Sequence, residues 1–160
     1  MKNILLPSDL TLTSLYPVHE ICQRAAGQQI NIRIIHTLTM PSGIADLLFL
    51  QQRKPYDKVS PSFMEALELL RKKYASVINI LSFEFLWGSS RTYLNFYMES
   101  RDIQFVYLLK DHTYEKGLPQ SVNCVAALQK CDVPLIYVEK ANPVEFGTLT
   151  TLLYREKMPA

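Results

Sequence analysis

Short, nearly continuous apolar runs recur along the chain, and stretches with an apolar residue at every third or fourth position separate them. The continuous runs predict buried strands, and the spaced positions predict amphipathic helices. The expected strands are residues 3–8, 30–38, 77–87, 103–109 and 134–138. Strands that alternate with helices imply right-handed crossovers, so we expect an α/β fold with a doubly wound sheet and helices on both faces.

The helices expected between these strands are residues 15–27, 61–76, 94–101 and 121–131. Thr13 or Ser14 is expected to cap the first helix, because a hydroxyl oxygen can accept a hydrogen bond from a free amide of the first turn. Ser60 followed by Pro61 is typical of a helix start and marks the second. Residues 44–58 have mixed periodicity and predict no more than one or two helical turns.

Composition is consistent with a single domain. The chain has 160 residues, of which 48% are hydrophobic, and this is sufficient for one ordinary core. Its 17 basic and 15 acidic side chains are mixed, and the basic run 71–73 is short, so we expect no nucleic-acid partner. No leader pattern opens the sequence and no apolar run has the length of a membrane span, which predicts a soluble, cytoplasmic protein without a membrane partner.

The cysteines and histidines point to structure rather than chemistry. An odd number of cysteines in apolar helical patterns favours buried, reduced thiols over disulfides; they are Cys22, Cys124 and Cys131. His36 lies inside an apolar strand and is interpreted as a hydrogen-bonded structural histidine, while the spacing suggests no partner for His19. His112 lies in a polar loop, where chemistry is possible, but no nucleophile elbow or metal-ligand spacing accompanies it. We therefore expect no catalytic residue and no metal.

The ends of three predicted strands carry motifs of a known family. The first strand ends in Pro7-Ser8-Asp9, the second ends in Ile34-Ile35-His36-Thr37, and the last is the proline-containing apolar run 133–138. In these motifs and in the order of its elements, the chain resembles the universal stress protein family over roughly residues 2–138. The resemblance implies a Rossmann-like, five-stranded parallel sheet of order 3-2-1-4-5, as in adenine nucleotide alpha hydrolases, and often a dimer paired through the last strands.

The chain departs from the ATP-binding members of this family at their glycines. Those members have a glycine after the fourth strand, another three residues later, and a Gly-Ser or Gly-Thr pair at the last helix. Here Leu109 or Lys110 stands near the first position, and the loop 111–117 does not reproduce the second. Gln120 takes the place of the glycine before Ser121. Because a Cβ obstructs the approach of backbone amides to phosphate, ATP or AMP is disfavoured and we expect no cofactor.

By the same resemblance, a vestigial nucleotide crevice lies where the strand order reverses. Its candidate residues are Pro7, Ser8, Asp9, Thr37, Ser121 and Val122. The resemblance implies that Asp9 and the backbone of Thr37 would contact ribose and adenine. The alternative is that Asp9 caps the first helix or is solvated at the end of its strand.

The last predicted strand lies at an edge of the sheet, where unpaired backbone groups and aliphatic side chains need cover. We assign residues 1–140 to the α/β domain and 141–160 to a C-terminal extension that packs on this edge or at a dimer interface. The interface expected for a homodimer consists of Pro134, Leu135, Ile136, Tyr137 and Val138. The alternative is that the extension covers the edge within one chain.

These observations together predict a non-enzymatic regulatory or interaction module, similar to universal stress proteins, with a degenerate nucleotide crevice and an unidentified protein partner. The alternative is an atypical family member that binds AMP or ATP with at most slow hydrolysis. A glycine-rich loop before Ser121 would favour the alternative, but residues 111–121 contain Gly117 as their single glycine.

Overall fold

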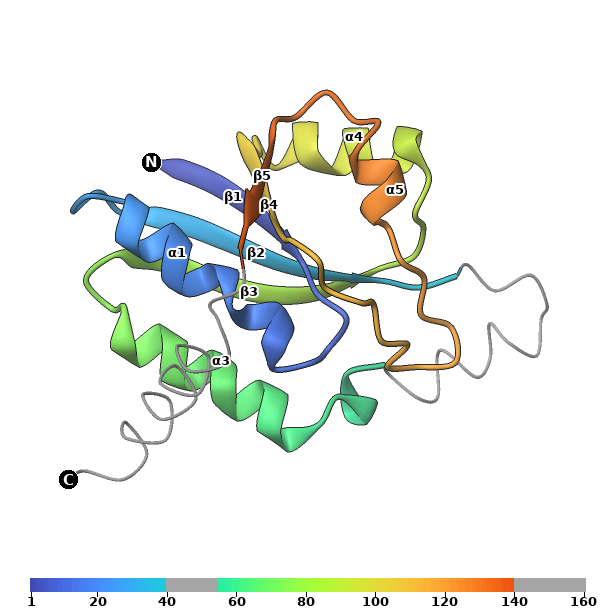
Figure 1. Ribbon diagram of the computed structural model, residues 1–160, viewed down its shortest axis with the longest axis horizontal. Helices are drawn as coiled ribbons and strands as arrows, with labels where there is room; N and C mark the ends of the chain where they lie inside the picture. The colour runs from blue at the N-terminus through green and yellow to red at the C-terminus, as the bar shows by residue number, and fades with distance from the viewer. Residues whose placement is uncertain (40–54, 140–160) are drawn as a thin grey trace.

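The strands predicted from the apolar runs are present, and they form one parallel sheet (Figure 1). The computed structural model describes residues 1–39 and 55–139. The strands are β1 (Lys2–Pro7), β2 (Ile30–Thr37), β3 (Ile78–Leu86), β4 (Phe105–Leu109) and β5 (Leu135–Val138). Neighbouring strands pair in parallel in the order β3-β2-β1-β4-β5, which confirms the predicted doubly wound topology.

Helices cover both faces of this sheet (Figure 1). They are α1 (Pro17–Arg24), α3 (Pro61–Lys73), α4 (Arg91–Ser100) and α5 (Val125–Leu128), with the 3-10 turns η1 (Thr13–Leu15) and η2 (Pro55–Lys58). Helices α1 and α3 lie on one face, and α4 and α5 lie on the other. Among the described residues, no helix has both the length and the apolar character that a membrane crossing requires.

Each face of the sheet has its own apolar core, because the inner strands are buried on both sides. Ile34 of β2 shares a core with Phe63 of α3 on one face. On the other face, Leu5 of β1 and Val106 of β4 are paired across the strands and share a core with Leu94 of α4. All of these side chains are fully buried. Burial of one such side chain stabilises the fold by roughly 1.5–3 kcal/mol.

The first helix begins differently from the prediction. It starts at Pro17, after the η1 turn, and no side chain caps it. The Ser14 hydroxyl instead donates to the carbonyl oxygen of Thr11 at 2.6 Å and lies 2.6 Å from the Ser8 hydroxyl. The predicted cap by Thr13 or Ser14 is therefore wrong, because Ser14 ties this turn to the end of β1.

The start of α3 follows its sequence signal. The Ser60 hydroxyl accepts a hydrogen bond from the Phe63 amide at 3.2 Å, and Pro61 lies in the first turn, which confirms this cap. The η2 turn falls within the segment 44–58, for which one or two helical turns were expected. The part of that segment before residue 55 and the C-terminal extension 141–160 lie outside the described residues.

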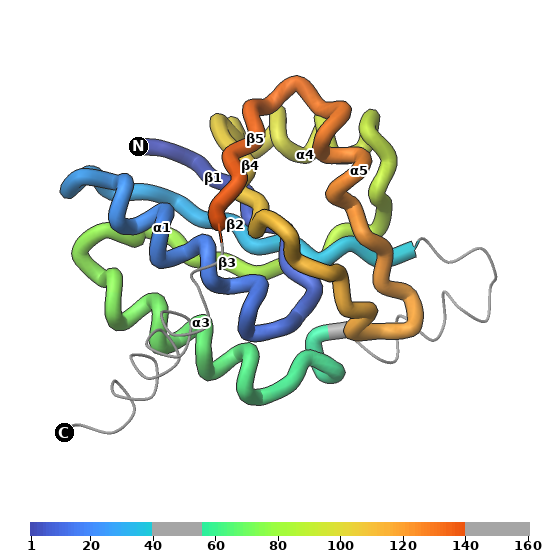
Figure 2. The backbone as a smooth tube through the Cα atoms, in the orientation of Figure 1, coloured from blue at the N-terminus to red at the C-terminus, as the bar shows by residue number. Residues whose placement is uncertain are grey.

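Residues 110–124, which connect β4 to α5, cross the carboxyl end of the sheet, and we call them the crevice loop. Figure 2 shows this loop passing beside the end of β2 before it returns to α5. Ser121 of the loop forms an antiparallel bridge with Leu38, and the Val122 amide donates to the carbonyl of Thr37 at 3.0 Å. The predicted helix start at residue 121 is wrong because this segment pairs with the end of β2, so that α5 begins only at Val125.

Candidate functional site

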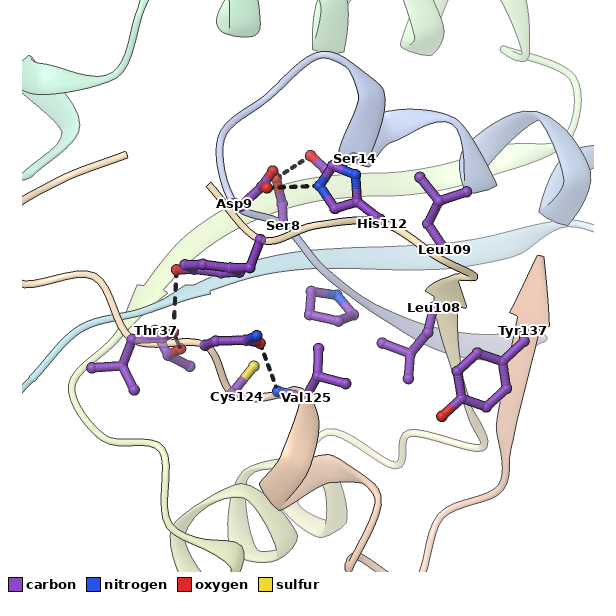
Figure 3. A pocket seen from close by; sticks show the side chains of 14 residues that line it. Ser8, Asp9, Ser14, Thr37, Leu108, Leu109, His112, Cys124, Val125 and Tyr137 are labelled. Carbon is purple, nitrogen blue, oxygen red and sulfur yellow. Dashed lines mark hydrogen bonds and ion pairs between the residues drawn. The ribbon is translucent and has the colours of Figure 1, made fainter. Parts of the chain in front are cut away.

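The carboxyl ends of β1, β2 and β4 meet where the strand order reverses, which is where ligands bind in doubly wound sheets. A pocket of about 130 Å³ opens there (Figure 3). All of the predicted crevice residues except Ser121 line this pocket: Pro7, Ser8, Asp9, Thr37 and Val122. Ser121 is buried and does not line it. The structure therefore brings the predicted residues together at one place.

Asp9 is 3% exposed and its carboxylate accepts four hydrogen bonds. Oδ1 accepts from the Thr11 amide at 3.2 Å and from the Thr11 hydroxyl at 2.5 Å. Oδ2 accepts from the Glu115 amide at 2.9 Å and from Nε2 of His112 at 2.7 Å. Asp9 is thus neither a cap of the first helix nor a solvated side chain, and both of those expectations are wrong, because the crevice loop closes over it.

These contacts decide the charge state of Asp9. Burial by itself raises the pKa of this carboxyl, but the hydrogen bonds from Thr11, Glu115 and His112 outweigh burial and hold the pKa below its ordinary value. Asp9 is therefore an anion at neutral pH. Figure 3 shows the imidazole of His112 directed at this carboxylate.

The pairing of Asp9 with His112 was not predicted, because the sequence places His112 beside Asp111 rather than beside Asp9. The two residues lie 103 positions apart. A signal existed, since Asp9 follows β1 and His112 follows β4, and these strands are neighbours in the predicted order. The turn into the loop also depends on Asp111, whose φ of 59° is in the left-handed region.

Gly117 allows the crevice loop to lie close to the end of β1. A Cβ at this position would meet the carbonyl oxygen of Asp9 at 3.2 Å and Cδ1 of Leu10 at 3.1 Å. Both contacts are tighter than ordinary packing permits. Gly117 thus allows the loop to pack against Asp9 and Leu10.

His36 is a structural histidine, as predicted. Its Nδ1 donates to the carbonyl oxygen of Ser8 at 2.7 Å, and its Nε2 accepts from the Ser121 hydroxyl at 2.6 Å. The Ser121 oxygen in turn accepts from the Leu118 amide at 2.9 Å. Burial lowers the pKa of His36 and outweighs the opposing effects of Ser8 and Asp9. The neutral ring therefore joins β1, β2 and the crevice loop.

Thr37 is also paired with the crevice loop. Its hydroxyl donates to the carbonyl oxygen of Val122 at 2.5 Å, and its carbonyl accepts from the Val122 amide at 3.0 Å. Polar groups at the ends of β1 and β2 are thus bonded to the chain itself. We call these groups the closed side of the crevice: Ser8, Asp9, His36 and Thr37.

The opposite wall of the pocket is formed by β4, β5 and the start of α5, and we call it the open side. It consists of Leu108, Leu109, Val125 and Tyr137. Figure 3 shows Leu108, Val125 and Tyr137 gathered on this wall, away from Asp9 and His112. Leu108, Leu109 and Val125 were not predicted as site residues, because an apolar strand or helix face in a sequence indicates core packing. Tyr137 was predicted for the dimer interface and not for the crevice.

Among its described lining residues, the pocket contains no activated thiol. Cys124 lines it, but burial raises the pKa of this thiol to about 11, so that it is protonated at neutral pH. Cys22 is also buried, as expected, whereas Cys131, which was expected to be buried, is half-buried; all three cysteines are free. Within residues 1–39 and 55–139, no group of three or more histidine, cysteine or acidic side chains is arranged to hold a metal ion.

The predicted dimer residues form an edge of the sheet. Pro134 precedes β5, and β5 pairs with β4 alone among the described strands. Tyr137 is 46% exposed, whereas Val138 is buried. The residues assigned to the interface therefore present an edge that the described part of the chain leaves partly uncovered.

Comparison with known proteins bears on the fold. No protein-family model and no curated protein matches the sequence. Among solved structures, universal stress protein UspA from Lactobacillus plantarum matches with a TM-score of 0.56 at 13% sequence identity, over 86% of this chain and 97% of that chain. A universal stress protein family protein from Arabidopsis thaliana with AMP bound matches with a TM-score of 0.53 at 8% identity, over 89% and 94%.

A universal stress protein in complex with cAMP matches with a TM-score of 0.50 at 11% identity, over 88% of this chain and 98% of that chain. At these identities the similarity is one of fold. It confirms the architecture that the sequence motifs implied, a five-stranded parallel sheet of the kind found in universal stress proteins.

Proposed function

We propose that this chain, which has the fold of universal stress proteins, is a non-enzymatic regulatory or interaction module with a degenerate nucleotide crevice. The observation that carries this proposal is the saturation of Asp9 by donors of the chain itself. A nucleotide that used Asp9 would have to displace His112 and the Glu115 amide. Because a hydrogen bond to a charged group contributes about 1.5–3 kcal/mol, this displacement weakens such a ligand by roughly 3–6 kcal/mol.

The lining of the pocket supports the same proposal. It includes no lysine, arginine or glycine among the described residues, and Asp9 is an anion at its wall. Nucleotide phosphates bind to cationic side chains or to backbone amides in glycine-rich turns. A phosphate placed here would lose its hydration without gaining such partners.

Titration calorimetry with ATP and AMP tests the proposal. The expected dissociation constants are no tighter than about 100 μM, or roughly −5.5 kcal/mol. Micromolar affinity for ATP that is lost in Asp9→Asn and kept in Asp57→Asn would overturn it. Asp57 is a suitable control because it is an exposed carboxylate in η2.

The alternative is an atypical AMP- or ATP-binding protein with at most slow hydrolysis. It is favoured by the position of the pocket at the reversal of strand order and by the AMP and cAMP bound in the similar structures. In this alternative the crevice loop must leave Asp9, so His112→Ala should strengthen the binding of AMP. Chromatography of the small molecules released from the purified, denatured protein distinguishes the two proposals, because a stoichiometric nucleotide would support the alternative.

A module of this kind is also proposed to act as a homodimer through β5. The support is the partly exposed edge of the sheet at Tyr137 and its neighbours, since an uncovered edge strand invites pairing with another chain. Light scattering should report twice the chain mass of 18.4 kDa at micromolar concentration. A monomeric protein, or an unchanged mass in a folded Ile136→Asp variant, would eliminate this interface.

A further inference from the structure

We infer that the open side of the pocket binds a small, uncharged molecule with a single ring, and that it rejects the same ring when a phosphate is attached. This inference rests on the proposed function, because it takes the crevice to have lost its nucleotide and kept a smaller, less polar site. Three features of the pocket carry it: its size, the charge of its lining and the state of its hydrogen-bonding groups.

The size of the pocket suits one ring. Its volume is about 130 Å³. An apolar cavity of about 150 Å³ in another protein is known to hold one benzene molecule. A nucleotide has a base, a sugar and phosphates, so most of it would lie outside a pocket of this volume while the crevice loop stays bonded to Asp9.

The lining excludes an anion. Asp9 contributes a negative charge, and His112, when protonated, offsets this charge without leaving a positive excess. Lys110 is the cation closest in sequence to the β4 wall, but it does not line the pocket and lies 3.3 Å from the carboxylate of Glu139. A phosphate in the pocket would thus face a carboxylate, with no lysine or arginine among the described residues that line the pocket, whereas an uncharged ring loses little on leaving water.

The remaining polar groups allow one or two hydrogen bonds to a neutral ligand. The Thr37 hydroxyl proton and the Asp9 lone pairs are already used. The oxygen of Tyr137 accepts from Nε2 of Gln129 at 2.9 Å, which leaves the Tyr137 proton available. The Asn123 oxygen accepts from the Val125 amide at 3.1 Å, which leaves its amide protons available. Both of these groups are donors, so they favour a ring that carries a neutral oxygen acceptor.

Phenol and phenyl phosphate are the matched probes, because they share one ring and differ in the phosphate. Titrations followed by amide chemical shifts should show phenol binding with a dissociation constant of about 1 mM, an affinity within the range that small fragments reach. The largest shifts are expected at residues 122–125 and at Tyr137. Phenyl phosphate should bind at least ten times more weakly. Equal or tighter binding of phenyl phosphate would overturn the inference.

A pair of variants on α5 tests whether phenol binds on the open side of the pocket. Val125→Phe fills the pocket from its open side, whereas Ala126→Phe adds the same ring at an exposed position outside the lining. Phenol binding should be lost in Val125→Phe, with a decrease of at least tenfold, and kept in Ala126→Phe. Unchanged phenol binding to a folded Val125→Phe variant would overturn the inference. If that variant does not fold, the comparison of phenol with phenyl phosphate on the unsubstituted protein tests the inference by itself.

The outcome is separable from the proposed function. Tight ATP binding would overturn the proposed function and this inference together. Absence of both ATP and phenol binding would overturn only the inference, since a degenerate crevice does not require any ligand. Binding of phenol without ATP supports both.

Discussion

The two sides of the crevice use their residues in opposite ways. On the closed side, the crevice loop forms hydrogen bonds with the side chains of Asp9, His36 and Thr37. On the open side, Leu108 and Val125 face a hollow pocket and form a largely apolar wall. The polar groups of one wall are thus hydrogen-bonded to the protein itself, whereas the apolar wall opposite faces the pocket.

Under the proposed function, this difference explains how a fold of this kind can lose its nucleotide without losing its architecture. When the phosphate-binding glycines are absent from the loop after β4, the carboxylate at the end of β1 still needs partners, because a buried anion without hydrogen bonds is costly. His112 and the Glu115 amide supply these partners to Asp9. The closed side should therefore matter for stability, and the open side for ligands.

The largest effect is expected from removing the anion of the closed side. Asp9→Ala leaves His112, the Glu115 amide and the Thr11 amide without their acceptor, so the free energy of unfolding should fall by about 3 kcal/mol. Urea denaturation measures the change. Asp57→Ala removes an exposed carboxylate and should stay within about 0.5 kcal/mol. A loss in Asp9→Ala as small as in this control would show that the closed side does not hold the loop.

A smaller effect is expected at the histidine of the closed side. His36→Phe removes the donor to the buried Ser8 carbonyl and the acceptor of the Ser121 hydroxyl proton, which should cost about 2 kcal/mol. A double-mutant cycle with Ser121→Ala should give a coupling of about 1 kcal/mol. The same cycle with Ser76→Ala, an exposed serine outside the crevice, should give none.

Acid is expected to weaken the closed side gradually. Burial tends to raise the pKa of Asp9, but hydrogen bonds lower it overall. Such a carboxyl stabilises the fold fully above its unfolded pKa of about 3.9 and loses this contribution as the pH falls through its lower folded-state pKa. The expected slope is at most about 1.4 kcal/mol per pH unit. The stability difference between the unsubstituted protein and Asp9→Asn should therefore shrink below about pH 4, as denaturation at each pH will measure.

A second titrating group, His19, lies outside the crevice. Its effect on the dependence of stability on pH can be separated from that of Asp9. Burial and the charge of Lys73 lower the pKa of His19 to about 4. Between its ordinary value of about 6.5 and about 4, the unfolded state binds more protons, so stability falls as the pH falls. His19→Gln should reduce this upper part of the profile and leave the part below about pH 4. The reverse pattern would contradict both assignments.

The smallest effect is expected on the open side. Val125 is half-buried beside the pocket, so Val125→Ala should lower the free energy of unfolding by less than about 1 kcal/mol. Val106→Ala removes the same atoms from a fully buried position in β4 and should cost about 2 kcal/mol. Thermal or urea denaturation compares the two variants. Equal losses would mean that the open side is as tightly packed as the core.

Much of the fold could be predicted because apolar periodicity records which faces are buried. The continuous runs located each strand to within a few residues, and Ser60 with Pro61 marked the start of α3. The prediction was wrong where a local signal competed with other contacts of the folded chain. Ser14 has the chemistry of a cap, yet it bonds to Thr11 and Ser8. Residues from 121 onward have helical spacing, yet they pair with the end of β2.

The sequence by itself determined the sheet, the residues gathered at its carboxyl end and the absence of phosphate-binding glycines, because these follow from local residue types and from their order along the chain. The tertiary structure alone decided what those residues touch. Asp9 meets His112 across 103 positions, and His36 meets Ser121 across 85. Such contacts depend on the path of the crevice loop over neighbouring strands, and periodicity carries no information about that path.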